Sequence, residues 1–251
     1  MSDITTTSPL NTLGAWLGYA PSKMSRGWLS FIESLIVAVV LTGLSYLAGL
    51  EFHWIASVNW LEAFAVFTSY SCTYLCVVQR RINYPIGALS TAAYCILFWQ
   101  TGLLGSAALN LYLTPTLIYG FIRWQRDSNP RPVTLVKDSA KWVPLYLIVT
   151  VAAYFGGSFV VQALGGKLAF FDVVILVGTV LAQLLMDNKK LENWIIWAIV
   201  DAVAIYVYFS SGLVVAGIQY IFFLLNAVWG FIEWRNSRKA VVYTPAQEVS
   251  A

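Results

Sequence analysis

Charged residues are scarce in this chain: only 11% of its 251 residues are Asp, Glu, Lys or Arg, whereas 59% are hydrophobic. Soluble globular domains carry about 25% charged residues. The composition therefore excludes an ordinary soluble protein and predicts an integral membrane protein that acts within the lipid bilayer. The formal net charge of +3 comes from basic residues spread over separate sites, so we expect no nucleic-acid partner.

Histidine and cysteine are also rare. His53 is the only histidine, and one histidine in a predicted loop cannot hold a metal ion alone. Cys72, Cys76 and Cys95 lie within apolar runs, and their odd number argues against disulfide bonds. The runs contain no nucleophile–base pair, metal-ligand cluster or glycine-rich phosphate loop. We therefore expect no enzymatic activity, no cofactor, and no ATP coupling within the chain.

Long apolar runs dominate what is present. A membrane-spanning helix needs about 20 predominantly apolar residues. We predict an all-α integral membrane protein with about eight transmembrane helices, at residues 28–50, 58–78, 83–101, 103–124, 141–165, 170–187, 192–210 and 212–234.

The basic residues predict the orientation of these spans. With eight spans, every lysine and arginine except Lys167 falls on one side of the membrane. Basic residues accumulate in cytoplasmic loops, so this side is expected to be cytoplasmic. Segments 1–27 and 236–251, and hence both termini, then lie in the cytoplasm of a cell with the protein in its inner membrane.

The chain contains an internal repeat. A shift of about 110 residues places segment 61–124 on 171–234 without a gap, and Gly120-Phe121-Ile122 then matches Gly230-Phe231-Ile232. Each copy holds three spans, and the single span between them makes the copies parallel. The sequence predicts a 3+1+3 bundle over 58–235 with a substrate site between the repeats, plus one extra N-terminal helix at 28–50. Its parts are repeat one (58–124), a linker helix (141–165) and repeat two (170–235).

The span at 192–210 carries the clearest candidate site. Trp194, Trp197 and Asp201 are spaced i, i+3 and i+7, so they share one face of a helix. A carboxylate near the middle of a span costs about 2.5–3.5 kcal/mol unless it faces a cavity or a partner. Two indole rings beside a carboxylate suit a flat, aromatic, cationic ligand. The alternatives are an interfacial tryptophan belt and a structural partner for the acid.

Other polar side chains inside the spans are further candidates. Mid-span amides can bind the hydroxyl groups of a substrate or bridge two helices. Tyr94 can form an aromatic wall or pack in the core. Asn83 and Asn193, which begin repeat-related helices, are expected to cap them. The amides in question are Gln183, Asn110, Gln219 and Asn226, of which Asn110 and Gln219 fall one position apart in the repeat register.

Several stretches resemble the PnuC family of vitamin transporters, and the resemblance extends over 58–235. Its W-x-x-W-x-x-x-N motif matches Trp194, Trp197 and Asp201, except that Asp201 stands where the family usually has Asn. The resemblance implies a seven-helix core similar to that of the SWEET sugar facilitators, assembled as a homotrimer. The other matching stretches are Ile82-Asn83-Tyr84-Pro85-Ile86-Gly87, Ile118-Tyr119-Gly120-Phe121-x-x-Trp124, Asp172, Ala182-Gln183, and Lys190-Leu191-Glu192-Asn193.

The resemblance also implies a function and leaves alternatives. It implies facilitated diffusion of an unphosphorylated vitamin precursor, most often nicotinamide riboside, which a cytoplasmic kinase traps by phosphorylation. Related members carry thiamine or riboflavin, and Asp201 would suit the cationic rings of nicotinamide riboside and thiamine better than neutral riboflavin. A SWEET-like sugar facilitator would not need Asp201. A retinal protein would need a mid-span lysine, and every lysine here lies at a membrane edge.

Overall fold

The computed structural model describes residues 26–102, 104–124, 131–163, 170–210, 212 and 214–243. Over these residues the all-α prediction is confirmed, and most helices begin and end close to the predicted spans. The last helix differs, because it continues to Tyr243, beyond the predicted end at residue 234. The elements are α2 (Arg26–Glu51), α3 (Trp60–Val77), α4 (Asn83–Gln100), α5 (Leu104–Arg123), the 3₁₀ helix η1 (Val136–Trp142), α6 (Val143–Ala163), α7 (Phe170–Asp187), α8 (Asn193–Ser210) and α9 (Val214–Tyr243).

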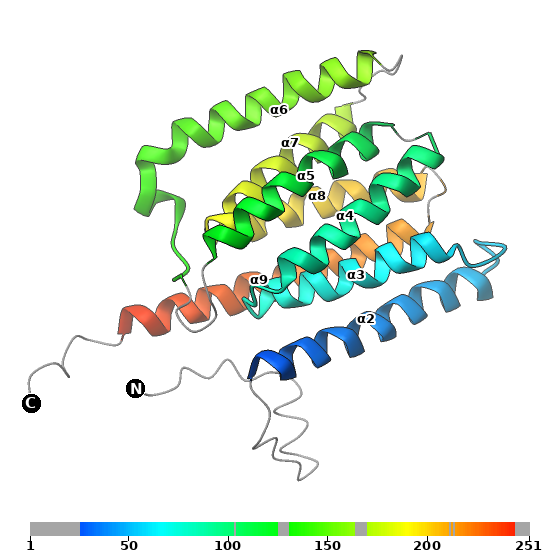
Figure 1. Ribbon diagram of the computed structural model, residues 1–251, viewed down its shortest axis with the longest axis horizontal. Coiled ribbons are helices and arrows are strands. Elements are labelled where there is room, and N and C mark those ends of the chain that lie inside the picture. The colour runs from blue at the N-terminus through cyan, green and yellow to red at the C-terminus, as the bar shows by residue number, and fades with distance from the viewer. Residues whose placement is uncertain are drawn as a thin grey trace, which may run out of the picture.

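Six of these helices form a ring. In repeat one α4 packs against both α3 and α5, and in repeat two α8 packs against both α7 and α9. The repeats meet at two seams, where α5 contacts α7 and α9 contacts α3. Figure 1 shows the helices running along a common direction, with α2 and α6 at opposite edges of the bundle. The ring leaves an interior that both repeats line.

The two outer helices occupy equivalent places. α6 packs over the seam between α5 and α7, and α2 packs over the seam between α3 and α9. Each outer helix precedes its own repeat in the chain. The helix predicted as an extra and the helix predicted as a linker are therefore related by the same pseudo-symmetry as the repeats. The sequence match between the repeats begins only at residue 61, because outer helices that meet lipid need only be apolar.

Polar contacts join α2 to repeat one. The Tyr74 hydroxyl donates a hydrogen bond to Glu33 Oε2 at 2.7 Å, and the hydroxyl oxygens of Ser34 and Ser71 lie 3.0 Å apart. All four side chains are removed from solvent and lipid. Hydrogen bonds between helices within a bilayer are individually modest, about 0.6 kcal/mol each. Together they fix which face of α2 meets α3.

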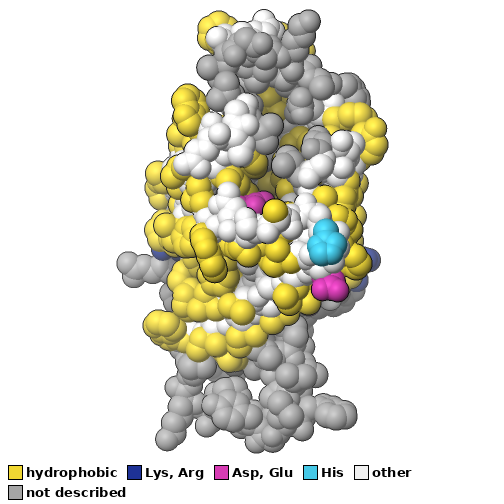
Figure 2. All heavy atoms as spheres, turned by 90° about the vertical axis from the view of Figure 1, so that its right-hand side faces the viewer, with side chains coloured by type: hydrophobic (Ala, Val, Ile, Leu, Met, Phe, Trp, Pro, Cys, Tyr) yellow, Lys and Arg dark blue, Asp and Glu magenta, His cyan; other side chains and the backbone are white. Residues whose placement is uncertain are grey.

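The helices differ in how apolar they are. By length and apolar composition, three helical stretches of the described residues suffice to cross a membrane: Gly27–Glu51, Asn193–Ser210 and Val214–Lys239. Val143–Phe159 and Val174–Asp187 are apolar but shorter. α3, α4 and α5 carry Ser, Thr, Asn and Tyr side chains that face the interior, which lowers their hydropathy. Figure 2, an end-on view, shows hydrophobic side chains over much of the described surface. The protein is a multi-pass membrane protein.

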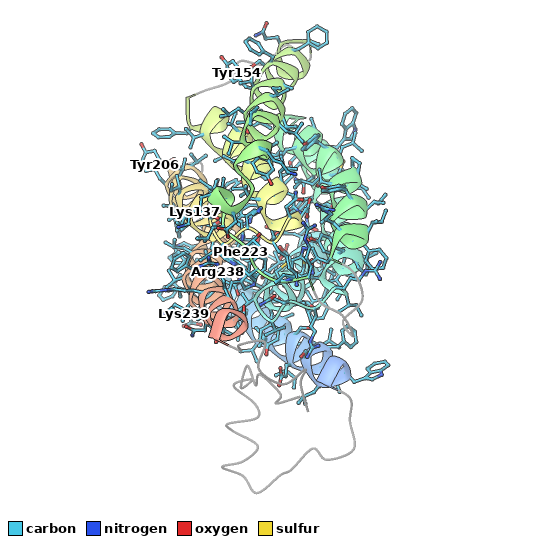
Figure 3. The ribbon with its side chains drawn as sticks, turned by 90° about the vertical axis from the view of Figure 1, so that its left-hand side faces the viewer. Lys137, Tyr154, Tyr206, Phe223, Arg238 and Lys239 are labelled. Carbon is cyan, nitrogen blue, oxygen red and sulfur yellow. The ribbon has the colours of Figure 1, made fainter. Side chains whose placement is uncertain are left out.

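The described lysines and arginines gather at one end of the bundle, which we call the basic end. They come from the α3–α4 turn, the end of α5, the segment before α6, the α7–α8 turn and the end of α9. Figure 3 looks at this end and labels Lys137, Arg238 and Lys239 there. The same view shows Tyr154 and Tyr206 pointing outward from the bundle. This sorting of charge is what the predicted topology requires.

Two tryptophans brace the repeats against each other. Trp124, at the end of α5, donates its indole N–H to the Met186 carbonyl of α7 at 3.1 Å. Trp234, its repeat-mate in α9, donates to the Cys76 carbonyl of α3 at 3.2 Å and to the Val77 carbonyl at 3.1 Å. Cys76 and Met186 are themselves repeat-mates. The internal repeat is therefore present in the contacts as well as in the sequence.

The expectation that Asn83 and Asn193 cap their helices was wrong. A capping side chain accepts hydrogen bonds from backbone N–H groups of the first turn. Here each amide instead donates backwards at 2.6 Å, from Asn83 to the Arg80 carbonyl and from Asn193 to the Lys190 carbonyl. Neither Oδ1 has a hydrogen-bond partner in the part of the chain that the structure describes. Ile82 occupies the N-cap position of α4. Both asparagines stabilise the tight turn before their helix rather than its first turn.

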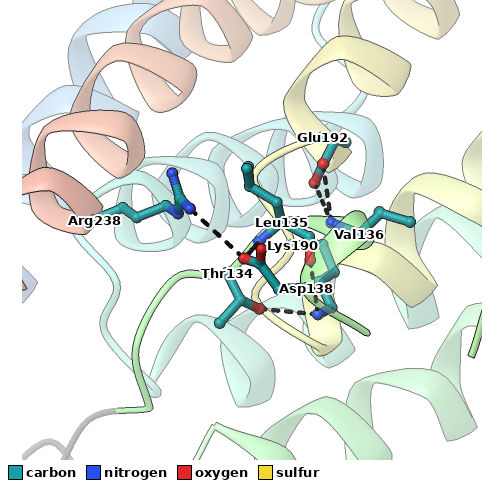
Figure 4. A network of polar contacts seen from close by, with 7 residues as sticks. All are labelled: Thr134, Leu135, Val136, Asp138, Lys190, Glu192 and Arg238. Carbon is teal, nitrogen blue, oxygen red and sulfur yellow. Dashed lines mark hydrogen bonds and ion pairs between the residues drawn. The ribbon is translucent and has the colours of Figure 1, made fainter. Parts of the chain in front are cut away.

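A strap at the basic end ties the segment before α6 to the α7–α8 turn (Figure 4). Thr134 forms a parallel β-bridge with Lys190, whose ammonium group donates to the Thr134 hydroxyl at 2.9 Å. Both carboxylate oxygens of Glu192 accept the Val136 N–H, at 2.9 and 3.0 Å, at the start of η1. A carboxylate is favourable at a helix N-terminus. The strap therefore attaches the start of α6 to repeat two.

Candidate functional site

The ring of six helices encloses a cavity of about 200 Å³. All six helices of the two repeats contribute side chains to its lining. The structure brings every residue predicted for the site into this one cavity; their role in binding stays a prediction. These residues are Tyr94 of α4, Asn110 of α5, Gln183 of α7, Trp194, Trp197 and Asp201 of α8, and Gln219 and Asn226 of α9.

The indole of Trp194 is held in place by close packing. Trp194 is buried, and its ring lies edge-on to that of Trp234 with centroids 5.3 Å apart. It also lies against Gly230, where an added Cβ would overlap the indole. Among the described residues the indole N–H has no hydrogen-bond partner. Glycine at position 230 therefore lets the Trp194 ring lie against α9 at the edge of the cavity.

Asp201 is the one acidic residue among the described residues that line the cavity. Its side chain is only 2% exposed, and no hydrogen bond or ion pair joins it to another residue in the described part of the chain. Leaving a buried charge without a partner costs several kcal/mol. The described lysines and arginines lie at the basic end, away from the middle of α8. The carboxyl group is therefore free to bind a cation or to carry a proton.

Two amides of α9 reach across the seam to repeat one. The Tyr94 hydroxyl donates to Gln219 Oε1 at 2.5 Å, and the buried Gln219 Nε2 has no hydrogen-bond partner among the residues described. Asn226 Nδ2 lies 3.5 Å from the Thr73 carbonyl of α3. Each amide thus uses one of its two polar groups to bridge the helices and has the other available for a ligand. The helix-bridging and ligand-binding interpretations are therefore compatible.

Asn110 differs from the other amides. Its Nδ2 donates to the Ser106 carbonyl at 2.9 Å within α5. Asn110 and Gln219, one position apart in the repeat register, both line the cavity from different repeats, with no hydrogen bond between them among the contacts described. The side-chain oxygen Oδ1 of Asn110 is thus left as a hydrogen-bond acceptor in the cavity lining.

Sequence reasoning missed a second polar group beside the cavity. Asp187, the last residue of α7, is fully buried, and its Oδ1 accepts hydrogen bonds from Tyr84 Oη at 2.9 Å and Gln183 Nε2 at 2.8 Å. Gly120 of α5 makes room for the group, because an added Cβ there would overlap both Tyr84 and Asp187. Asp187 ends a helix and precedes Asn188 and Lys189, a polar sequence that is typical of a solvated turn and carries no signal of burial.

Further lining residues could have been found by extending the periodicity. Tyr208 lies one heptad after Asp201 on α8, and Thr179 lies one turn before Gln183 on α7. Both side chains line the cavity. Residues spaced by three, four or seven positions share a helix face, so the known candidates pointed to them. They add two hydroxyl groups to the indoles, amides and carboxylate already described.

Comparisons with known proteins agree on one family. The family model described as "Nicotinamide mononucleotide transporter" matches residues 59–236. The chain is 24% identical over 211 residues to the nicotinamide riboside transporter PnuC of Escherichia coli K12, covering 72% of this chain and 87% of that protein. It is 28% identical over 189 residues to the protein of the same name from Neisseria mucosa, covering 70% of this chain and 72% of that protein.

Two further comparisons concern a more distant relative and the fold. The riboflavin/roseoflavin transporter RibM of Streptomyces davaonensis is 26% identical over 156 residues, covering 57% of this chain and 72% of that protein. A solved structure titled "Crystal structure of the Vitamin B3 transporter PnuC" superposes with a TM-score of 0.66 at 21% identity, covering 86% of this chain and 99% of that one. That likeness supports the same helical fold. Because the family model spans both repeats and every residue of the cavity, the chain belongs to the nicotinamide mononucleotide transporter family, that of the PnuC transporters.

Proposed function

We propose that the protein takes up an unphosphorylated vitamin precursor by facilitated diffusion, with nicotinamide riboside as the leading substrate and a cytoplasmic kinase trapping it afterwards. One observation carries the proposal: indoles, amides and one unpaired carboxylate converge in a single cavity between the two repeats. The names of the relatives support the substrate class. Transport rather than chemistry is the activity of the family.

The lining suggests a division of labour. Trp194 and Trp197 supply aromatic surface for the flat ring of the substrate, and Asp201 opposes its positive charge. Nε2 of Gln219 and Oδ1 of Asn110 form hydrogen bonds with the ribose hydroxyls. A riboside fixed in this way would be held by stacking and charge, while the amides would determine which substituents fit.

Thiamine is the second candidate, and Asp201 is the observation that favours it. The carboxylate replaces the usual Asn of the family motif and has no counter-charge among the described residues. Thiamine carries a permanent positive charge on an aromatic ring, as nicotinamide riboside does. Riboflavin, the substrate in the name of one relative, has a neutral ring that would gain less from Asp201. A neutral sugar could donate hydroxyl hydrogen bonds to it but would gain no charge pairing.

Transport would follow from rocking of one repeat against the other. The repeats, 58–124 and 170–235, meet mainly along the α5–α7 and α3–α9 seams of the ring. The bond from Tyr94 to Gln219 crosses between them at the cavity and would break and re-form in each cycle. The strap and the packing of α6 on α7 would carry the linker helix with repeat two.

The setting in the cell completes the proposal. We place the basic end, and with it both terminal segments, in the cytoplasm of a cell with the protein in its inner membrane. The protein would assemble as a homotrimer, with one cavity in each protomer. Native mass spectrometry of the detergent-purified protein tests the trimer, and cysteine labelling in intact cells tests the orientation.

Binding calorimetry and uptake into proteoliposomes test the function together. Purified protein is titrated with nicotinamide riboside, thiamine and riboflavin, and the ligand that binds is then offered to proteoliposomes as a radiolabelled solute. Saturable uptake driven by the substrate gradient alone supports facilitated diffusion, and uptake that requires an imposed proton gradient contradicts it. Absence of binding to all three vitamins contradicts the proposal, and a sugar panel would follow.

A further inference from the structure

The carboxyl group of Asp187 lies one helical turn behind Gln183 on α7, toward the basic end. Asp187 has no exposed surface and does not line the cavity, whereas Gln183 does. Gln183 Nε2 donates to Asp187 Oδ1 at 2.8 Å, and Tyr84 Oη of repeat one donates to the same oxygen at 2.9 Å. Two donors from different repeats therefore converge on one acceptor just outside the cavity.

This arrangement fixes the orientation of the Gln183 side chain. An amide has a donor end and an acceptor end, and it can present either one after a rotation of about 180° about its last torsion. The Oδ1 atom of Asp187 accepts from both Tyr84 and Gln183 and has no hydrogen of its own to donate, so it offers Gln183 an acceptor and nothing else. The amide must place its NH₂ group against Asp187, and its carbonyl oxygen remains for the cavity.

The internal repeat does not require the contact between Asp187 and Gln183. Under the shift of about 110 residues, Val77 corresponds to Asp187 and Thr73 corresponds to Gln183. Neither residue of that pair in repeat one can form an acid–amide contact. Gly120 is fitted to the group as well, because any side chain there would overlap Tyr84 and Asp187. The acid is therefore a specific feature of repeat two rather than a consequence of its helix packing.

We propose that Asp187 is a positioning residue for substrate selection, which locks the Gln183 amide so that its carbonyl oxygen accepts a hydrogen bond from a donor group of the substrate. The inference rests on the proposed vitamin-transport function and adds a rule to it: the cavity recognises a hydroxyl or amino group at this point and disfavours an analogue without that donor. An acceptor-only group placed there would face the Gln183 oxygen and be rejected.

The test compares binding of substrate analogues by calorimetry on full-length protein. The panel consists of nicotinamide riboside, its 2′-, 3′- and 5′-deoxy analogues, and nicotinic acid riboside, in which a carboxylate replaces the carboxamide. The variant Gln183→Leu shows which analogue reports on this residue. It should bind that analogue and nicotinamide riboside equally well, because the side chain that distinguishes them is gone. In the wild type we expect this analogue to bind about five- to tenfold more weakly than the parent.

Two variants then separate positioning from mere stability. Asp187→Leu removes the acceptor that holds the NH₂ group of Gln183, so the amide can turn. We expect the discrimination against the reporting analogue to fall below about twofold. Tyr84→Phe is the matched control, since it removes the other hydrogen bond to the same oxygen and leaves the Gln183 contact in place. It should keep the discrimination of the wild type.

Each outcome decides the inference. Equal weakening of all ligands in Asp187→Leu, or unchanged discrimination, overturns it, as does a panel in which no analogue depends on Gln183. If Asp187→Leu does not fold, Asp187→Ala is measured with the same expectation. If the wild type binds thiamine instead, oxythiamine and a thiamine analogue without its hydroxyl replace the panel. Absence of any vitamin binding by the wild type overturns the proposed function itself, which is a different result.

Discussion

The two repeats share the contacts that hold the ring of helices together, but they differ in the side chains that line the cavity. Trp124 and Trp234 make reciprocal hydrogen bonds to the opposite repeat. Gly120 and Gly230 each make room for an aromatic ring that begins the middle helix of its own repeat, Tyr84 in one case and Trp194 in the other. Gly102 and Gly212, in the turns that follow the middle helices, adopt nearly equal positive φ angles of 76° and 74°.

The polar residues of the cavity do not follow this symmetry. Asp201 corresponds to Thr91, and Gln183 corresponds to Thr73. The carboxylate and the amide that Asp187 positions both belong to repeat two. The comparison separates two constraints: positions that keep the ring closed remain alike in both copies, whereas positions that face the interior have diverged. Variants at paired positions can test this separation.

The largest effect is expected at the paired glycines. Gly120→Ala would place a methyl group within Tyr84 and Asp187, and Gly230→Ala would place one within the Trp194 indole. Overpacking of this kind should destabilise the fold by about 2–3 kcal/mol in either repeat. Thermal unfolding in detergent measures it. Gly156→Ala on α6 is the control, since an added Cβ there meets nothing within 4 Å and alanine favours a helix, so the melting temperature should not fall.

The next effect is expected where the repeats differ. Asp201→Asn should weaken binding of a cationic vitamin about 10- to 100-fold, because a charge-assisted contact becomes a neutral one. Thr91→Val at the paired position should change the affinity less than about threefold. Calorimetry on both variants measures the two values. Equal losses of affinity at the two positions would show that the cavity lining is as symmetric as the contacts that close the ring.

A smaller and symmetric effect is expected at the reciprocal tryptophans. Trp124→Phe and Trp234→Phe each remove an indole hydrogen bond to a carbonyl of the other repeat and leave a ring in place. Each change should cost about 1–2 kcal/mol of stability, and the two costs should agree closely. Thermal unfolding of the two variants side by side is the measurement. A strongly unequal pair would contradict the equivalence of the braces.

The smallest effect is expected at the bond that crosses the cavity. Tyr94→Phe removes the hydrogen bond to Gln219 and keeps the aromatic wall, so affinity should change about two- to fivefold. Its effect on the rate of uptake should exceed its effect on affinity if the bond re-forms in each cycle. Tyr206→Phe is the control, because Tyr206 is 61% exposed and points away from the bundle (Figure 3).

The fold was predictable because its signals are local and additive. Apolar runs of spanning length located each helix, and the repeat register indicated which helices are equivalent. α9 extends beyond its prediction because the charged residues after Trp234 end an apolar run without ending a helix, and Arg238 there forms an ion pair with Asp138 at 3.7 Å. The residues after Trp234 still favour a helix although they no longer form an apolar run.

The candidate site was predictable only in part. Side chains on the Trp194 face could be found by their spacing, and the mid-span amides by their polarity. Asp187 could not, because its burial depends on Tyr84 and Gly120, which are distant in the sequence. The direction of the Asn83 amide depended in the same way on the turn before it rather than on the helix after it.

The reciprocal tryptophans also bear on how the chain is made. Trp124 finds its acceptor in Met186 of the second repeat, and Trp234 finds its acceptors in the first. During synthesis the first four helices enter the membrane before their closing contacts exist, and they must wait there for the remainder of the chain. A gene divided between α5 and η1 should therefore yield two fragments that are degraded when expressed singly and that assemble when expressed together.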